Sequence, residues 1–274
     1  MDDNNIETLE FQCDEKATIK VNIMDFIVNS LEGFEDFLNY IKKEKGDLVN
    51  AIIEEAISQS KDVEDFGIQV EAEFNILQNN PVFYNMIINT LLDLLNYPKY
   101  KKKPLKEEII VDVLDLVKGY ILFDYLQANS MLAAMSREEV INLIQNYIRA
   151  TIESRSNSAN FIESLKDYVN TLKNTTMMWQ THDGILKLCN DEKIVYKVRK
   201  CRWAEVLQDC DKEICYSMMC YQDLFQVKNL NPDFNLTRTK TIMQGDDYCD
   251  FCYHDERKVK EIIHPSEKFW NNFS

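Results

Sequence analysis

Seven of the eight cysteines lie between Cys189 and Cys252, in the last third of the 274-residue chain. Several stand in short polar sequences, of which Cys220-Tyr-Gln-Asp223 pairs a thiol with a carboxylate. Thiols can act as nucleophiles, bind metal ions or form disulfides, and a nearby acid or base decides how reactive they are. This part of the chain is therefore where chemistry is expected.

Cys220 and Asp223 are three residues apart in a segment with helical periodicity, so their side chains are neighbours on one face of a helix. A carboxylate at that distance can act as a base or orient water, and it raises the pKa of the thiol unless a cation balances it. Arg238 could supply that cation or bind a substrate carboxylate through two parallel hydrogen bonds. The structural alternative is a core thiol, a surface acid and an arginine that forms an ion pair with it.

A zinc site needs four thiolates or imidazoles close together, and two Cys-x-x-Cys pairs are its most specific signature. The chain has one such pair, Cys249 and Cys252, and residues three apart on a strand point to opposite faces. A looser site that combines Cys201 with Cys220 and Cys249 stays open, and zinc is the metal it would hold. The sequence requires no cofactor. The other cysteines of this region are expected to pack in the core: Cys189, Cys210, Cys215 and Cys252.

The chain has three histidines, His182, His254 and His264. None of them has a Cys-His or Ser-His spacing that suggests catalysis, and no nucleophile-histidine-acid triad is visible. We therefore expect them in turns or at the surface.

The pattern of apolar residues predicts helices in the first two thirds of the chain and short strands after that. Ser136 and Glu139 have the spacing of a capping box, and Asp211 is a candidate N-cap. The predicted helices cover residues 23–40, 47–57, 62–77, 82–95, 105–127, 136–153, 159–172, 202–208 and 212–228. The predicted strands cover residues 177–182, 185–189, 193–200, 236–242 and 248–253.

These elements predict an α+β fold, with a helical N-terminal portion followed by a small antiparallel-sheet domain with packed helices. Residues 1–104 would form a helical region of unknown role, and residues 105–262 the α+β domain. Residues 263–274 would be a C-terminal tail. The lysine-rich run at 99–106 is expected to be a solvated linker.

The formal net charge of −15 disfavours binding to nucleic acid or to anionic lipid. No stretch has the roughly 18 apolar residues of a spanning helix, and the first residues do not have the pattern of a signal peptide. We expect a cytoplasmic protein whose partner is a small molecule, with a homodimer as a further prediction. In a reducing compartment its cysteines would not form disulfides.

Five short sequences follow one another in the last third of the chain: Val198-Arg-Lys-Cys201, Cys220-Tyr-Gln-Asp223, Leu230-Asn-Pro-Asp-Phe-Asn-Leu236, Arg238-Thr-Lys-Thr-Ile242 and Gly245-Asp-Asp-Tyr-Cys249-Asp-Phe251. In this order they resemble the L-2-amino-thiazoline-4-carboxylic acid hydrolase family. The resemblance extends over residues 112–255. It assigns the α+β domain at 105–262 to that family.

The resemblance implies hydrolytic opening of a thiazoline-type ring, with water adding to the carbon between nitrogen and sulfur. Such a reaction needs an activated nucleophile, a donor to the ring nitrogen and a cation for the substrate carboxylate. At the matched positions, Cys220 and Cys249 would be nucleophile or metal ligand and Asp223 the base. Arg238 and Asp250 would bind the substrate.

The same region is distantly similar to 4-vinyl reductase type domains, which implies the alternative of a non-catalytic small-molecule sensor. An enzyme would bring Cys220, Asp223, Arg238 and Cys249 together at a polar pocket. A sensor would have a larger apolar cavity. A third alternative, an interaction protein, would expose an apolar helical face within residues 82–95.

Overall fold

The computed structural model of the chain describes residues 6–14, 16–59, 70, 73–97, 108–155, 162–174, 180–189 and 191–273. The chain divides into two compact units. One contains Lys16–Tyr147 and is called the helical unit here, whereas Met1–Glu15 and Ile148–Ser274 together form the sheet unit. Both helices and an antiparallel sheet are present, which confirms the predicted α+β class.

The helical unit is built from segments in which apolar residues recur at helical spacing and turn toward a common core. The predicted capping box is confirmed, because Glu139 N–H donates to Ser136 Oγ over 3.3 Å and Ser136 N–H donates to Glu139 Oε2 over 3.0 Å. The elements are β2 (Thr18–Asn22), α1 (Ile23–Lys45), α2 (Leu48–Gln59), α3 (Pro81–Leu94), β3 (Glu108–Asp112), α4 (Val113–Ser130), the 3-10 turn η2 (Met131–Ala133) and α5 (Arg137–Arg155), the last of which continues into the sheet unit.

One prediction for this unit needs correction, and the exposed face that an interaction protein would require is not found. The helix expected over 105–127 starts only at Val113, because residues 108–112 form β3, which pairs antiparallel with β2. The apolar face expected at 82–95 in an interaction protein is mostly buried, although Val82 is 65% exposed. The buried residues of that face are Phe83, Ile87, Ile88, Leu91 and Leu92. The predicted helix at 62–77, the basic run at 99–106 and the strand at 177–182 fall largely outside the described residues.

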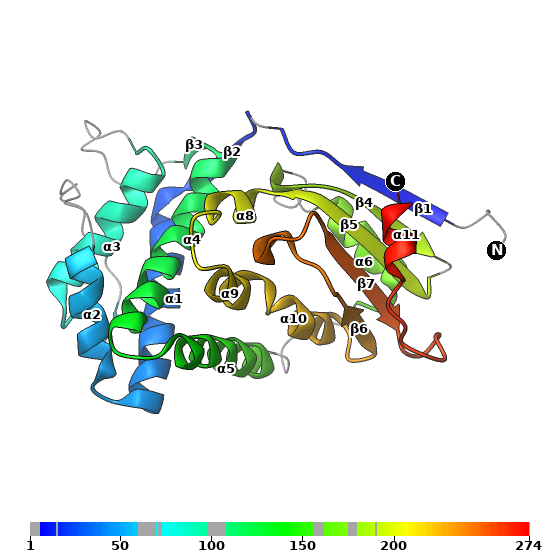
Figure 1. Cartoon of the computed structure of the whole chain (residues 1–274). Helices are drawn as coiled ribbons and strands as arrows, with labels where there is room; N and C mark the ends of the chain where they lie inside the picture. Colours follow the sequence, from blue (N-terminus) through cyan, green and yellow to red (C-terminus); the bar gives the residue numbers. More distant parts are fainter. Residues whose placement is uncertain are drawn as a thin grey trace. The chain divides into compact units, whose positions relative to one another are not determined.

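The sheet unit contains a five-stranded antiparallel sheet in the order β1-β4-β5-β7-β6 (Figure 1). Segments rich in β-branched and aromatic residues form its strands. The predicted helix N-cap at Asp211 is confirmed, because its carboxylate accepts hydrogen bonds from the N–H groups of Glu213 and Ile214. The elements are β1 (Ile6–Phe11), α6 (Leu165–Lys173), β4 (His182–Cys189), β5 (Lys193–Cys201), α8 (Arg202–Val206), α9 (Lys212–Cys215), the π-helical turn η4 (Tyr216–Cys220), α10 (Asp223–Leu230), β6 (Phe234–Thr237), the 3-10 turn η5 (Ile242–Gln244), β7 (Cys249–Asp255) and α11 (Glu267–Asn271).

The first strand of the chain is an edge strand of this sheet. In β1, Ile6 pairs with Cys189 and Phe11 with Gly184 of β4. The two compact units have their boundaries at 15/16 and 147/148, and β1 belongs to the sheet unit although the sequence suggested a separate region for residues 1–104. The reason is that main-chain hydrogen bonds to a distant strand leave no mark in local sequence patterns.

The two faces of the sheet pack against different helices. On one face lie α6 and α10, with Cys249 in the apolar cluster that they cover. On the other face lie Cys252 and the aromatic residues of the C-terminal segment, Trp270 and Phe273. Cys249 and Cys252 of β7 thus point to opposite sides of the sheet, as their spacing predicts.

Residues 263–274 were expected to be a tail, but Trp270 and Phe273 of this segment belong to the apolar cluster on the sheet. Trp270 is 1% exposed and packs with Ile185, Val195 and Cys252. The ammonium of Lys197 donates to the Trp270 carbonyl over 2.6 Å. Two large aromatic residues spaced by one helical turn supply the apolar area that docks this short segment.

Gly184 lies where β4 approaches β5 closely, and its substitution tests the strand pairing. A Cβ at Gly184 would lie 2.5 Å from the Lys197 carbonyl oxygen and 2.9 Å from the Tyr196 ring. We expect Gly184→Ala to lower the free energy of unfolding by about 1–3 kcal/mol, measured by urea denaturation. Gly33→Ala is the control, because no atom lies within 4 Å of its added Cβ, and it should stabilise helix α1 by about 0.5–1 kcal/mol. Equal effects of the two substitutions would contradict the register of β4 and β5.

Candidate functional site

The helix predicted over residues 212–228 is interrupted by the π-helical turn η4, which ends at Cys220. The N–H of Tyr221 donates to the carbonyl of Tyr216, five residues earlier, over 2.9 Å. Such wide turns inside α-helices occur frequently at functional sites. Here the turn is followed, after two intervening residues, by Asp223, the first residue of α10, so the sequence Cys220-Tyr-Gln-Asp223 joins the two helical segments.

The Arg238 guanidinium holds this junction together. It forms an ion pair with Asp223 over 2.7 Å and donates to the Cys220 carbonyl over 2.8 Å. The rings of Phe251 and Tyr216 lie 5.0 Å and 5.6 Å from it, within the range of cation–π attraction. The arginine side chain is only 2% exposed. The structure therefore brings Cys220, Asp223 and Arg238 together, and the guanidinium is already bound within the protein.

Asp223 also faces a small pocket of about 130 Å³, together with Tyr168 and Tyr253. Burial raises the pKa of the Asp223 carboxyl, while the Arg238 guanidinium acts in the opposite direction. The hydroxyls of the two tyrosines are hydrogen-bonded to each other, and burial raises the pKa of Tyr168 to about 12. The pocket thus offers a carboxylate that is more basic than an ordinary aspartate, beside two protonated phenols.

The three candidate thiols are protonated at neutral pH. Burial raises the pKa of Cys201 to about 11 and that of Cys249 to about 12. For Cys220, burial and the Asp223 carboxylate raise the pKa well above its ordinary value, although Arg238 lowers it. A negative charge on Cys201 or Cys249 would raise the pKa of Cys220 further, which indicates that the three side chains lie in one region. No thiolate nucleophile is therefore preformed among these three.

The thiols were also predicted as metal ligands. Among the residues that the structure describes, no three His, Cys, Asp or Glu side chains form a group that could hold a metal ion. Cys249 Sγ instead accepts a hydrogen bond from the Ile242 N–H over 3.3 Å. Cys201, Cys220 and Cys249 thus do not belong to such a three-ligand group in the part of the chain that the structure describes, and zinc binding by these thiols stays a prediction.

Asp250 is separated from this group because neighbouring residues of a strand face opposite ways. Its side chain is fully buried, and Oδ1 accepts from the N–H groups of Thr239 and Lys240 over 2.8 Å and 2.7 Å. Oδ2 accepts from the Thr239 hydroxyl over 2.5 Å and lies 2.9 Å from Nε2 of His264. Asp250 holds the segment after Arg238 in place, and a direct contact with substrate stays a prediction.

The expectation that the histidines lie in turns or at the surface is wrong for His254, which is fully buried on β7. Thr237 Oγ1 lies 3.3 Å from its Nε2 and 2.9 Å from Nδ1 of His264. The reason is that β7 lies inside the sheet, between β5 and β6, although its sequence ends in charged residues.

His254 should make stability depend on pH. Burial lowers its pKa to about 4 from an ordinary value of 6.5. Between these pH values the unfolded chain binds a proton at His254 that the folded protein does not, so the contribution of His254 to stability falls as the pH drops from 6.5 to 4. At about 1.4 kcal/mol per pKa unit, this contribution is about 3 kcal/mol. Denaturation across this range should therefore show a loss that is larger by about this amount in the wild type than in His254→Gln. The matched change at the partly exposed His182 should leave the loss intact.

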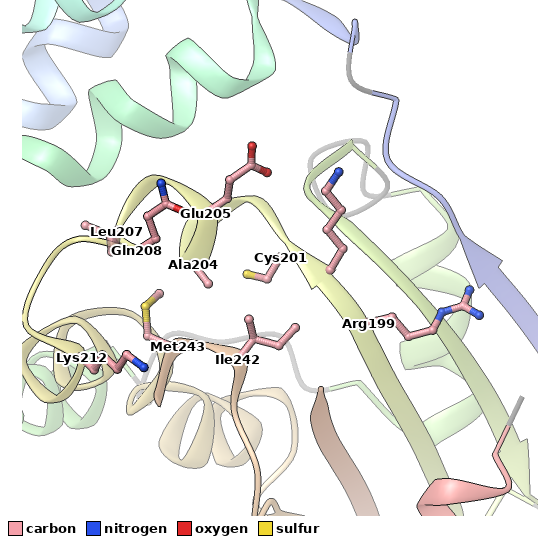
Figure 2. A pocket seen from close by; sticks show the side chains of 10 residues that line it. Arg199, Cys201, Ala204, Glu205, Leu207, Gln208, Lys212, Ile242 and Met243 are labelled. Atoms are coloured by element: carbon pink, nitrogen blue, oxygen red, sulfur yellow. The ribbon is translucent and has the colours of Figure 1, made fainter. Parts of the chain in front are cut away.

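A second pocket of about 430 Å³ lies beside α8 and η5 (Figure 2). Of the predicted site residues, Cys201 stands in its wall. Both basic and aliphatic side chains line the pocket, namely Arg199, Lys200, Cys201, Ala204, Glu205, Leu207, Gln208, Lys212, Ile242 and Met243.

Four aromatic residues of the site were missed in the sequence. Phe251 and Tyr253 could have been found, because they share with Cys249 one face of the predicted strand at 248–253. Tyr216 precedes Cys220 by four residues, and its position depends on the π-helical turn, which no sequence pattern indicated. Tyr168 reaches the site from α6, through a contact that is distant in sequence.

The family of this chain follows from the range of residues that matches a known family. Residues 117–253 match the L-2-amino-thiazoline-4-carboxylic acid hydrolase family. The chain belongs to this family. The match covers half of the chain and includes every residue of the Asp223 pocket, whereas β1 and α11 lie outside it. Membership of this hydrolase family suggests a hydrolase that acts on an L-2-amino-thiazoline-4-carboxylic acid-like substrate.

Among curated proteins, a search found no match to this family member. No helix in the described part of the chain is long and apolar enough to cross a membrane.

Proposed function

We propose that this family member opens the ring of a small carboxylated heterocycle of the thiazoline type by hydrolysis, with Asp223 as general base. The observation that carries the proposal is the position of Asp223, which pairs with Arg238 and faces a pocket shared with Tyr168 and Tyr253. A general base works best when its pKa lies close to the working pH, and burial moves the Asp223 carboxyl in that direction.

In the proposed reaction, a water oxygen bonds to the ring carbon between nitrogen and sulfur while Asp223 accepts a proton from that water, and the electron pair of the carbon–nitrogen double bond moves to the ring nitrogen. This pair then re-forms the double bond as the ring carbon–sulfur bond breaks, Asp223 returns the proton to the sulfur, and the remaining hydroxyl proton moves from oxygen to nitrogen to give the open-chain carbonyl product. A tyrosine hydroxyl of the pocket donates a hydrogen bond to the ring nitrogen. Arg238 acts as a positioning residue, because its ion pair orients the carboxylate and favours its charged form.

The thiols take a secondary role in this route, since Cys201, Cys220 and Cys249 are protonated in the folded protein. A covalent route remains open in which Asp223 removes the proton of Cys220 and the sulfur attacks the ring carbon. Cys220→Ser separates the two routes. Turnover that survives this change supports direct attack by water, and a loss with intact binding supports the thiol as nucleophile.

A non-catalytic small-molecule sensor is the second candidate. The protonated thiols favour it, as does the 430 Å³ pocket, which offers more room than the pocket at Asp223. In that case a ligand would bind to the protein and leave it unchanged.

The deciding experiment uses the full chain and L-2-amino-thiazoline-4-carboxylic acid in water enriched in oxygen-18. A hydrolase should give a ring-opened product that carries one heavy oxygen, detected by mass spectrometry. Saturable binding without ring opening would contradict the proposed hydrolysis of this compound and support the sensor.

A further inference from the structure

We propose that the 430 Å³ pocket beside α8, called the α8 pocket below, is a separate binding site for a small aliphatic anion such as a medium-chain carboxylate. Its volume lies within the usual range of about 300–1,000 Å³ for small-molecule sites. None of the residues that line it is among those of the Asp223 pocket. The proposal therefore adds a second ligand and does not depend on the hydrolysis.

The charge of the α8 pocket contrasts with that of the whole chain, whose formal net charge is −15. Three of the side chains that line the pocket are basic and one, Glu205, is acidic. Glu205 forms an ion pair of 2.7 Å with the buried Arg202, and Arg199 forms one of 3.1 Å with Glu10, so these two opposite charges are both compensated. The other charged residues of the lining, Lys200 and Lys212, are basic, and basic side chains in a cleft attract ligands of the opposite sign. The α8 pocket therefore favours an anion.

Lys212 is the residue placed to bind the anionic group. Figure 2 shows its side chain directed toward Met243, whereas the Arg199 guanidinium is directed away from the other lining residues. Arg199 pairs with Glu10 over 3.1 Å. The Lys212 ammonium lies against Gly245, where an added Cβ would come within 2.5 Å of it, and Gly245 has the positive φ of 103° that favours glycine. The ammonium therefore lies next to Gly245, at the wall of the pocket.

The remaining wall suits an alkyl chain. Ala204, Leu207, Ile242 and Met243 line the pocket with aliphatic or thioether groups, and Figure 2 shows them around the space next to Lys212. Cys201 adds a thiol that burial keeps protonated and uncharged. A ligand with a carboxylate at Lys212 and a flexible apolar chain along this wall would satisfy both parts of the pocket.

Octanoate is the probe that tests the proposal, with octylammonium as a ligand of the same chain length and opposite charge. We expect isothermal titration of the full chain to detect octanoate binding that is at least about tenfold tighter than octylammonium binding. Lys212→Met, which keeps the length of the side chain and removes the charge, should weaken octanoate binding by about tenfold or more. Lys268→Met removes an exposed lysine of α11 and serves as the matched control.

Two further variants make the test decisive. Gln208 is exposed at the rim, so Gln208→Trp should block the pocket without disturbing the core, and octanoate binding should be lost. Asp223→Asn should leave octanoate affinity unchanged, which separates this site from the hydrolytic one. Equal affinity for the two probes, or octanoate affinity within twofold of wild type in the folded Lys212→Met protein, would overturn the proposal.

Discussion

Asp223→Asn is expected to lower kcat/KM for thiazoline ring opening by about 10²–10⁴-fold. Asparagine has nearly the same size as aspartate, and its side-chain oxygen can still accept from the Arg238 guanidinium. It cannot take a proton from water. Because burial raises the pKa of Asp223, the kcat/KM of the wild type should rise with pH and level off above the ordinary aspartate value of 3.8. This rise should be absent in the residual activity of the variant.

The variant leaves Arg238, whose side chain is 2% exposed, without a counter-charge, so the folded state has to be verified by circular dichroism and thermal unfolding. Asp233→Asn is the matched control, since it removes an acid of the same unit. The Asp233 side chain is half exposed, and its ion pair with a surface arginine is long, at 3.7 Å. A folded Asp223→Asn protein with unchanged kcat/KM and an unchanged pH profile would exclude Asp223 as the base.

Trp270→Ala is expected to lower the free energy of unfolding of the sheet unit by about 3–5 kcal/mol. The indole is 1% exposed and stacks near His264, with ring centroids 5.6 Å apart. It also contacts the rings of Phe269 and Phe273 at 5.3 Å and 5.6 Å. Its removal leaves a large cavity on the face of the sheet opposite the Asp223 pocket. Urea denaturation followed by far-ultraviolet circular dichroism measures the loss.

Phe269→Ala provides the comparison on the same short helix. This ring is 41% exposed, so its removal should cost less than about 1 kcal/mol. Similar small effects of both substitutions would show that the C-terminal segment does not belong to the core of the sheet unit.

At the site, the sequence predicted the relative positions of side chains that lie close together in the chain. The helical spacing of Cys220 and Asp223, the N-cap at Asp211 and the opposite directions of Cys249 and Cys252 each follow from a local geometry. The ion pair of Arg238 with Asp223 was one of the alternatives that the sequence left open, because the two side chains carry opposite charges.

Features that depend on distant segments could not be predicted in this way. The strand β1 pairs with β4, and β2 pairs with β3. The local residue pattern of a strand does not indicate which other strand it pairs with. Tyr168 reaches Asp223 only because α6 covers the same face of the sheet as α10. Trp270 looked like part of a tail because its apolar neighbours come from β4, β5 and β7.

The pairing of β1 with the distant strand β4 also limits the order in which the protein can fold. The ribosome releases Ile6–Phe11 first, whereas its partner strand His182–Cys189 follows after the whole helical unit. At synthesis rates of about 5–20 residues per second, this interval is on the order of ten seconds or more. Contacts within the helical unit are nearer in sequence and can form during that time. Cotranslational folding should therefore proceed from the middle of the chain, and the sheet can be completed only after its last strand has been made.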